Sequence, residues 1–509
     1  MDSSEVPKMS EFNIKPAVFE VLASSRLGAL PVACLIGLLT IAVWRRYFSP
    51  LANLPGPFFA SFTRLWHIKA IIDGDQNVQL SRLHREHGHF VRITPNEVSV
   101  THPDGVKKIM LQPMQKGVFY GISAIPDWRY QTPMSSRDPK VKIERSKAFA
   151  SGYAQSNVLQ YEDAIDPLIE KLGQWMRKHA VSGSPMELDK FLLYTAFDVV
   201  GEVLFSRAFG FIEKGEDIGN SIANNLAQEA IGTPVAQFRW AQLLLGNPLV
   251  TCLGLSPGSM MMSTALTALV ERQKNPDARF DMAAHWFRYL EQHPDRTTLR
   301  NIQAQTTTNV GAGSDTVACA LQSVIYHMVR HPGTWAKARD EIDAARKDGF
   351  CLGTVVSNAD AQRLPYLQAC IKEGLRIHSP VPMGLPRVAP RGGITIGDMT
   401  FPEGTTLSIN PWVLHHSKEL WGEDADEWNP GRWLDENAAV LDRFWIPFSA
   451  GWMGCPGQHV ARMELSKICS TIIRDFDLRF VDPAKEWQWK AYFTMVPHSW
   501  PVHVSLRKK

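Results

Sequence analysis

Close cysteine pairs, internal repeats and a strong charge of either sign are all missing from this sequence. Its 509 residues contain seven cysteines, none of them in a Cys-x-x-Cys pair. A zinc ribbon and a disulfide framework are therefore excluded, and a reducing compartment is indicated. The net charge of +3 provides no basic surface of the kind that binds nucleic acid. With 45% hydrophobic residues, the chain is long enough to bury a large core.

A long charge-free run lies near the start of the chain. Residues 27–44 carry no charge and as a helix would measure about 27 Å, enough to cross a thin bilayer. Arg45 and Arg46 follow directly, which by the positive-inside rule places the rest of the chain in the cytosol. A cleaved signal peptide is the alternative, but the run is long for one and its upstream tail is acidic. The predicted segments are an N-terminal tail (1–26), a membrane anchor (27–44), a basic, proline-rich linker (45–57) and a main domain (58–509).

One cysteine stands in a segment that its neighbours make unusual. Cys455 lies among three glycines and directly before Pro456, within residues 448–457. Glycines permit tight turns and a close approach to a flat ligand. Pro456 suits the first turn of the helix that the apolar spacing from Leu465 to Phe476 predicts, and a helix N-terminus stabilises a thiolate. The alternative is that Cys455 is a small buried hydrophobe, the commoner role of a lone cysteine.

The spacing Phe-x-x-Gly-x-x-x-Cys-x-Gly in this segment resembles the haem-binding loop of the cytochrome P450 superfamily. The resemblance implies that Cys455 is the axial thiolate ligand of a haem iron, a ligation that favours O–O cleavage. It further implies that the haem is contacted by Phe448, Gly451 and Gly457. One position departs from the family pattern, because Met453 stands where an arginine usually pairs with a haem propionate.

A second motif lies in the middle of a long helical pattern from about Leu299 to Val329. Glycines inside a helix cost about 1 kcal/mol each relative to alanine, so those of this motif require a packing or functional reason. The segment from Gly311 to Thr316 resembles the oxygen-activation motif of the family. This implies haem contacts at Ala312 and Gly313. It implies proton handling by Asp315 and Thr316. The alternative for the threonine is a hydroxyl bonded to its own helix.

Two further motifs match the structural core of the family. Glu373 and Arg376 share one face of a helix that is predicted to be capped near residues 358–360 and to end at residues 379–380. Alone, such a pair is abundant and weak. The resemblance implies that the pair is buried and is joined by Arg432. A buried network of this kind must be fully hydrogen-bonded, and its implied role is structural.

The resemblance also assigns partners for the haem propionates. Arg387 lies in a strand-like segment, residues 384–388, and matches an arginine that reaches a propionate in the family. Lys142 and Arg145 are the other implied contacts, on a basic helix predicted over residues 142–149. A solvated charged face is the alternative for this helix.

The implied substrate pocket draws on several parts of the chain. Its lining residues are Phe119, Tyr120, Asn309, Met383 and Met495. The aromatic segment around Phe119 could equally pack on the surface. The apolar helical stretch from Asn220 to Leu255, which glycines and prolines interrupt, corresponds to the lid over the substrate and indicates a lipophilic substrate, although core helices have the same composition.

The match covers essentially the whole chain beyond residue 55 and is to eukaryotic microsomal enzymes, with residues 385–433 similar to fungal pisatin demethylases. It implies a mainly α fold with a small β region, haem b, and electrons from NADPH through NADPH–cytochrome P450 reductase, with cytochrome b5 as an optional second donor. The implied enzyme inserts one atom of O2 into a lipophilic small molecule of secondary metabolism at the endoplasmic reticulum membrane, by hydroxylation, epoxidation or oxidative demethylation. Alternatives are a haem-thiolate isomerase or peroxygenase that needs no reductase, and a non-catalytic membrane haem protein.

Overall fold

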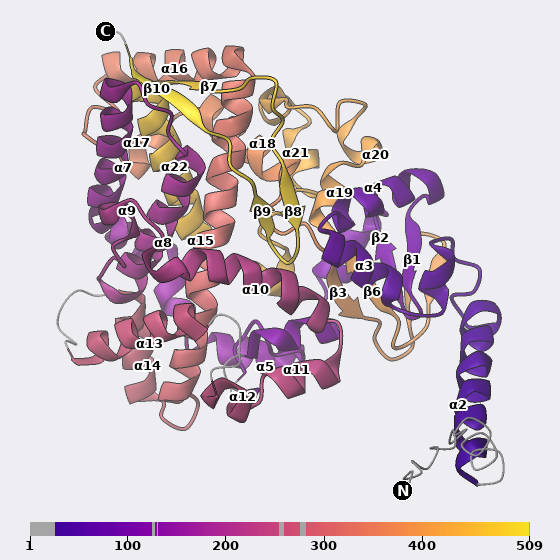
Figure 1. The fold of residues 1–509 in the computed structure, drawn as a ribbon. Coiled ribbons are helices and arrows are strands. Elements are labelled where there is room, and N and C mark those ends of the chain that lie inside the picture. Colours follow the sequence, from indigo (N-terminus) through magenta and orange to yellow (C-terminus); the bar gives the residue numbers. More distant parts are fainter. Residues whose placement is uncertain (1–25, 125–127, 130, 254–258, 275–280, 508–509) are drawn as a thin grey trace, which may run out of the picture.

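The computed structural model describes residues 26–124, 128–129, 131–253, 259–274 and 281–507. Most of these residues are helical, and the largest sheet lies at one side of the helical body (Figure 1). The predicted fold class, mainly α with a small β region, is confirmed. Almost all of the predicted N-terminal tail (1–26) lies outside the described residues.

The helix around which the others pack is α15 (Leu299–Arg330), which has 32 residues. Its N-terminus is closed by a capping box, in which the side chains of Thr298 and Asn301 each accept from the backbone N–H of the other residue. The helix ends at His331, directly before the proline that begins the next helix. Both ends agree with the sequence prediction.

Three long helices pack against α15 and share one hydrophobic cluster with it. They are α8 (Leu188–Phe205), α18 (Pro365–Ile377) and α22 (Gln458–Asp475). The longer of the remaining helices are α3 (Leu65–Asp73), α4 (Gln76–His87), α5 (Pro139–Ser146), α7 (Glu162–Ser182), α10 (Ser221–Val235), α11 (Arg239–Leu245), α13 (Ser259–Lys274), α14 (Met282–Gln292) and α16 (Pro332–Lys347). Short α-helices are α6 (Gln155–Val158), α9 (Phe211–Lys214), α12 (Pro248–Cys252), α17 (Asn358–Ala361), α19 (Pro411–His415), α20 (Lys418–Trp421) and α21 (Ala438–Leu441).

The largest sheet has four strands in the order β1-β2-β6-β3. The strands are β1 (Phe90–Thr94), β2 (Glu97–Val100), β6 (Thr406–Ile409) and β3 (Leu385–Val388). β1 and β2 form an antiparallel hairpin, β2 and β6 are parallel, and β3 is antiparallel to β6. Three two-stranded pairs complete the β structure: β4 (Ile394–Ile396) with β5 (Met399–Phe401), β7 (Phe476–Phe480) with β10 (Val502–Leu506), and β8 (Trp489–Ala491) with β9 (Met495–Pro497).

Two helices differ from their predicted bounds, both because of a proline. The single helix predicted from residues 358–360 onward is two helices, α17 and α18, since Pro365 begins a new one. The basic helix predicted over residues 142–149 begins earlier, as α5. There Pro139 occupies the first turn, and the Asp138 side chain accepts from the N–H groups of Lys140 and Val141.

The anchor predicted for residues 27–44 is helical. α2 (Arg26–Val43) continues into a π-helical turn, Trp44–Phe48, and stands apart from the body of the molecule (Figure 1). Between Leu30 and Val43 its apolar side chains are almost all exposed. Among the described residues, one helix, Leu30–Phe48, is long and apolar enough to cross a membrane. An exposed apolar surface of this extent is typical of membrane contact.

The linker that follows is bound to the body by Arg92 of β1. Nη2 of Arg92 donates to the carbonyl oxygen of Arg45 at 2.9 Å and to Oγ of Ser49 at 3.1 Å. Nη1 of the same side chain donates to the carbonyl oxygen of Leu51 at 3.2 Å. Leu51 is buried in the hydrophobic cluster built on the four-stranded sheet. The connection between anchor and body is therefore held at several points.

Candidate active site

The segment that carries Cys455 folds back on itself and on a neighbouring turn. Gly451 has a left-handed backbone (φ 61°), and a Cβ there would lie 2.7 Å from the carbonyl oxygen of Met110. Only glycine fits such a position. The Cys455 N–H donates to the carbonyl oxygen of Phe448 at 2.8 Å, which closes the loop. Phe448 and Gly451 thus shape the loop that holds the cysteine.

The sulfur of Cys455 lies at the N-terminal end of α22. Burial raises the pKa of the thiol, while hydrogen bonds from the backbone N–H groups of Gly457 and Gln458 act in the opposite direction by favouring the thiolate. No cluster of three or more His, Cys, Asp or Glu side chains in the described part of the chain could hold a metal ion. The surroundings of this sulfur therefore do not form a site of three or more protein ligands, and a lone axial thiolate on a haem iron fits them.

One face of α15 borders an open space at the middle of the helix. Ala312 is exposed and Thr316 is half-buried, although the neighbouring Ser314 and Val317 are buried in the core. The Thr316 hydroxyl donates to the carbonyl oxygen of Ala312 at 2.7 Å, which is the intrahelical bond considered above as the alternative. Its oxygen keeps acceptor capacity after this bond.

Gly313 has a packing role on another face of the same helix. A Cβ on Gly313 would lie 2.9 Å from a methyl group of Val200 on α8. The missing side chain therefore allows α8 and α15 to approach each other closely. Of the two predicted haem contacts on α15, Ala312 borders the open space and Gly313 faces a helix.

Asp315 points toward α10, which belongs to the predicted lid, rather than toward Thr316. Successive helical residues are about 100° apart around the axis. The Asp315 Oδ2 atom accepts from Nδ2 of Asn225 on α10 at 2.5 Å. Burial raises the pKa of Asp315 well above its usual value, and the nearby carboxyl of Glu229 raises it further. Burial and the neighbouring carboxyl thus favour the protonated form of Asp315.

Arg387 presents buried donors that no described residue satisfies. Its side chain is fully buried, and its Nη1 donates to the Tyr120 hydroxyl and to the Pro386 carbonyl oxygen, both at 3.0 Å. Nε and Nη2 have no partner among the described residues. A buried guanidinium with free donors is costly, so the position suits an anionic ligand group.

A second buried cation, Lys116, was missed from the sequence. Its Nζ donates to the carbonyl oxygens of Pro133 and Met134, at 3.0 and 2.5 Å. Burial, and then the charges of Arg387 and Lys142, lower the pKa of Lys116 to about 6. Nothing in its local sequence distinguishes this lysine, because its neighbours come from distant segments. A nearby anion would favour the charged form of this amine, so Lys116, Lys142 and Arg387 together fit a ligand with acidic groups.

The two cations predicted on α5 have different partners. Nζ of Lys142 donates to the carbonyl oxygen of Trp452 in the cysteine loop at 2.6 Å. Arg145 donates to Oε1 of Gln131 at 2.8 Å and to Oγ of Ser136 at 2.5 Å. Lys142 therefore lies at the site, whereas the Arg145 guanidinium is engaged by other side chains.

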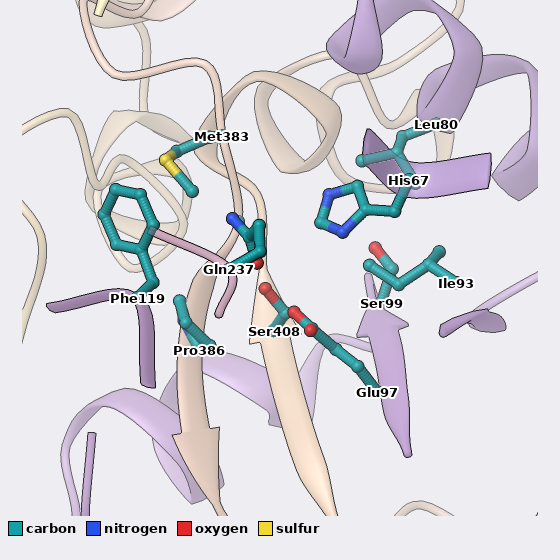
Figure 2. A pocket seen from close by; sticks show the side chains of 11 residues that line it. His67, Leu80, Ile93, Glu97, Ser99, Phe119, Gln237, Met383, Pro386 and Ser408 are labelled. Atoms are coloured by element: carbon teal, nitrogen blue, oxygen red, sulfur yellow. The ribbon is translucent and has the colours of Figure 1, made fainter. Parts of the chain in front are cut away.

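The predicted lining residues divide into two groups. Phe119, Tyr120 and Met383 share one small apolar cluster, and Met453 packs against it. Figure 2 shows Phe119 and Met383 on one side of a cavity, with polar side chains, among them that of Glu97, on the other. The other two predicted lining residues lie apart: Asn309 donates to the Tyr153 hydroxyl, and Met495 belongs to a different hydrophobic cluster.

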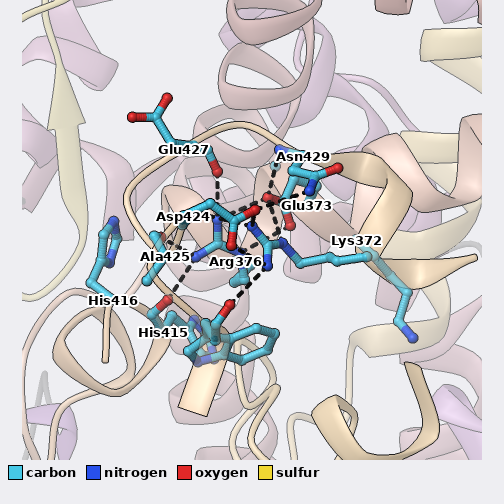
Figure 3. Close-up of polar contacts among 12 residues, drawn as sticks. Lys372, Glu373, Arg376, His415, His416, Asp424, Ala425, Glu427 and Asn429 are labelled. Atoms are coloured by element: carbon cyan, nitrogen blue, oxygen red, sulfur yellow. Dashed lines mark hydrogen bonds and ion pairs between the residues drawn. The ribbon is translucent and has the colours of Figure 1, made fainter. Parts of the chain in front are cut away.

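Glu373, Arg376 and Arg432 meet in one buried network (Figure 3). Arg376 forms a bidentate pair with Glu373, with N–O distances of 2.9 and 2.8 Å, and Arg432 Nε donates to Oε1 of Glu373 at 3.1 Å. Trp433 Nε1 supplies a further donor to Glu373 at 2.9 Å. The remaining donors of Arg376 reach the carbonyl oxygens of His415, Ala425 and Glu427. The charges are thus compensated by hydrogen bonds, as a buried ionic network requires.

The chain is similar to known proteins over most of its length. The family model described as Cytochrome P450 matches residues 55–498. A cytochrome P450 monooxygenase of Aspergillus terreus is 32% identical over 464 residues, which cover 88% of this chain and 94% of the relative. The cytochrome P450 monooxygenase cicH of Emericella nidulans is 30% identical over 489 residues, 90% of this chain and 94% of the relative. A pisatin demethylase of Fusarium vanettenii is 28% identical over 489 residues, 92% of each chain.

Proposed function

Because the chain belongs to the cytochrome P450 family, we propose that it is a haem-thiolate monooxygenase that oxidises a lipophilic small molecule. One atom of O2 enters a C–H or C=C bond of the substrate and the other leaves as water. For each substrate molecule, NADPH supplies two electrons through a membrane-bound reductase, and one further proton is consumed. Cytochrome b5 is an optional second electron donor.

The observation that carries the proposal is the placement of Cys455, as a lone thiol with two backbone donors in a glycine-shaped loop. Bound haem supplies the iron, and thiolate ligation favours O–O cleavage. Cys455 would provide that ligand. Arg387 would hold the acidic groups of the haem with its free Nε and Nη2 donors, assisted by Lys116 and Lys142. This set compensates for Met453, which offers no donor.

Protons for the reduction of O2 come from the acid–alcohol pair on α15. Burial favours the protonated form of Asp315, which suits a group that gives up a proton when the reaction demands one. Thr316 borders the open space, and its oxygen can accept a hydrogen bond while its own proton is held by the Ala312 carbonyl. In this proposal Asp315 stores the proton and Thr316 takes part in its delivery.

The substrate class follows from the surroundings of Phe119, Tyr120 and Met383. These side chains form an apolar cluster against which the thioether side chain of Met453 packs. Such surroundings favour a lipophilic, partly aromatic molecule. Several relatives are fungal monooxygenases, and some are named pisatin demethylases. We therefore assign the chain to secondary metabolism at the endoplasmic reticulum membrane, with oxidative demethylation as one of its candidate reactions.

The carbon monoxide complex of the reduced holoprotein tests the ligand. Cys455→Ser is expected to remove the red-shifted Soret band that a thiolate ligand produces. Cys252→Ser is the matched control, because this cysteine is exposed on α12 and far along the chain from the loop. A band that survives Cys455→Ser would refute the assignment.

A second measurement separates the monooxygenase from its alternatives. Soret shifts identify binding compounds in a library of lipophilic metabolites, and NADPH consumption is then measured with reductase present. Product that forms only with reductase and NADPH supports the proposal. Product that forms without them indicates an isomerase or peroxygenase.

A further inference from the structure

Two polar side chains on the lid helix α10 face Asp315. Asn225 and Glu229 are four residues apart, so they lie on the same face of α10. Nδ2 of Asn225 donates to Oδ2 of Asp315 at 2.5 Å, and the carboxyl of Glu229 is near enough to act on Asp315 electrostatically. One face of the lid thus brings a donor and a second acid to the proton-handling residue.

The turn between β8 and β9 holds Glu229 from another side. The N–H and the hydroxyl of Thr494 donate to Oε2 of Glu229 at 2.9 and 2.6 Å. Two donors on one oxygen favour the ionised form of Glu229. Asp315 has a single donor, at Oδ2, and its buried Oδ1 has no partner among the described residues. This asymmetry puts the negative charge on Glu229 and the proton on Asp315.

No positive charge of the described chain relieves the repulsion between these acids. The pKa of each carboxyl is raised by burial. The side chains that act on the pair are Asn225, Thr494 and the two carboxyls themselves. The thiol of Cys319, one turn further along α15, has its pKa raised by burial and by both carboxyls, so it stays neutral. Two neighbouring buried carboxyls without a cation share one proton.

We propose that Glu229 is a positioning residue of the oxygen chemistry, which keeps the shared proton on Asp315 for as long as α10 lies against α15. This inference rests on the proposed function and adds a regulatory element to the same site. When α10 moves away, the charge of Glu229 leaves the neighbourhood and water reaches Asp315, so the proton is released. A proton is therefore stored on Asp315 only while the lid is closed, and it is lost to water once the lid opens.

The infrared carboxylic-acid band of Asp315 in the full-length holoprotein is the direct test. The band is assigned by its loss in Asp315→Asn and requires no substrate, reductase or turnover. Glu229→Gln keeps an acceptor for Thr494 but removes the charge. In this variant the band is expected to titrate about one pH unit lower, or more, than in the wild type. An unchanged midpoint overturns the proposal.

Thr494→Val is the second variant, and it should move the midpoint in the opposite direction. Removing the hydroxyl donor destabilises the carboxylate of Glu229, so the two acids lose their shared proton at a higher pH. Part of the carboxylic-acid band then comes from Glu229. General loosening of α10 would hydrate both acids and lower the midpoint in both variants. Shifts in the same direction therefore count against the proposal.

Turnover separates this inference from the proposed function. In Glu229→Gln, product formed per NADPH should decline at a lower pH than in the wild type, and Asp315→Asn should abolish that difference. An infrared shift in Glu229→Gln without any monooxygenation would refute the proposed function. The inference that Glu229 and Asp315 share a proton would still stand. Monooxygenation with an unshifted midpoint would refute the role of Glu229 and leave the function in place.

Discussion

Met453 shows how the loss of one donor is absorbed by residues that are distant in the sequence. Its side chain packs beside Phe119, Tyr120 and Met383, so it contributes apolar surface where an arginine would contribute charge. In our proposal Arg387 takes over the binding of the acidic groups of the haem. Its side chain is fully buried and keeps two donor atoms without partners in the described chain. An uncompensated buried charge is unfavourable, so the holoprotein should depend strongly on this residue.

We predict that Arg387→Ala accelerates haem loss about tenfold or more, since a hydrogen bond to a charged group contributes about 1.5–3 kcal/mol. Haem transfer to an apoprotein acceptor measures the rate. Arg145→Ala is the matched control and should change the rate less, because Arg145 already donates to Gln131 and Ser136. Met453→Arg should restore part of the loss in the Arg387→Ala background. Equal rates for wild type and Arg387→Ala would contradict the assignment.

Thr316→Ala is predicted to leave the thiolate spectrum unchanged and to divert reducing equivalents to peroxide. The reason is that the hydroxyl handles protons and does not bind iron. Thr308→Ala provides the control, because Thr308 makes the same intrahelical bond, to the Ala304 carbonyl oxygen at 3.0 Å, two turns earlier on α15. The measured quantities are NADPH used, peroxide and product. Unchanged coupling in Thr316→Ala would rule out its role.

At the scale of single elements, α22 contains an unusual buried acid. Neither carboxyl oxygen of Glu464 has a hydrogen-bond partner in the described chain, and burial raises the pKa of Glu464 well above its usual value. The folded protein therefore holds this proton to a higher pH than the unfolded chain, which releases it above about pH 4.3. Stability contributed at this position is complete below that pH and declines as the pH rises toward the folded pKa.

Glu464→Gln is expected to remove this decline. The free energy of unfolding of the holoprotein should change less between pH 5 and pH 7 in the variant than in the wild type, by up to about 1.4 kcal/mol per pH unit. Denaturant titrations at the two pH values measure the difference. Glu403→Gln, at an exposed side chain, controls for the substitution itself. Parallel pH dependence in wild type and Glu464→Gln would show that Glu464 has an unseen partner.

Elements defined by local signals could be predicted, and those defined by tertiary contacts could not. The ends of α15 follow from Thr298 and from Pro332, which act within one turn of the helix. The division between α17 and α18 was missed, although Pro365 marks it. Lys116 and Glu229 could not be identified, because Lys116 acts together with Arg387 and Glu229 with Thr494, each more than 200 residues away in the chain. Cys455 could be identified, since its glycines and the following helix are contiguous.

At the scale of the whole molecule, the anchor and the four-stranded sheet lie at the same side of the body (Figure 1). The parallel pairing of β2 with β6 brings residues 97–99 beside residues 406–408, so this side of the molecule is assembled from both halves of the chain. α2 leaves the body from here with its apolar side chains exposed.

We expect protease added to intact microsomes to digest the main domain (58–509), because Arg45 and Arg46 retain their side of the anchor in the cytosol. Immunoblotting for the C-terminal part of the chain measures the loss. A resident lumenal protein must remain intact in the same sample, and detergent must abolish its protection. Full protection of the main domain would place it in the lumen.

The hydrogen bonds from Arg92 to the linker affect how the protein would associate with its proposed electron donor. An enzyme on a flexible linker would rotate freely and expose every face to its partner in turn. If α2 is the membrane anchor, a linker held at Arg45, Ser49 and Leu51 keeps the main domain in one orientation relative to the bilayer plane. Encounter with the proposed membrane-bound reductase would then be a search in two dimensions between partners that are already oriented, with little orientational entropy left to lose at each collision.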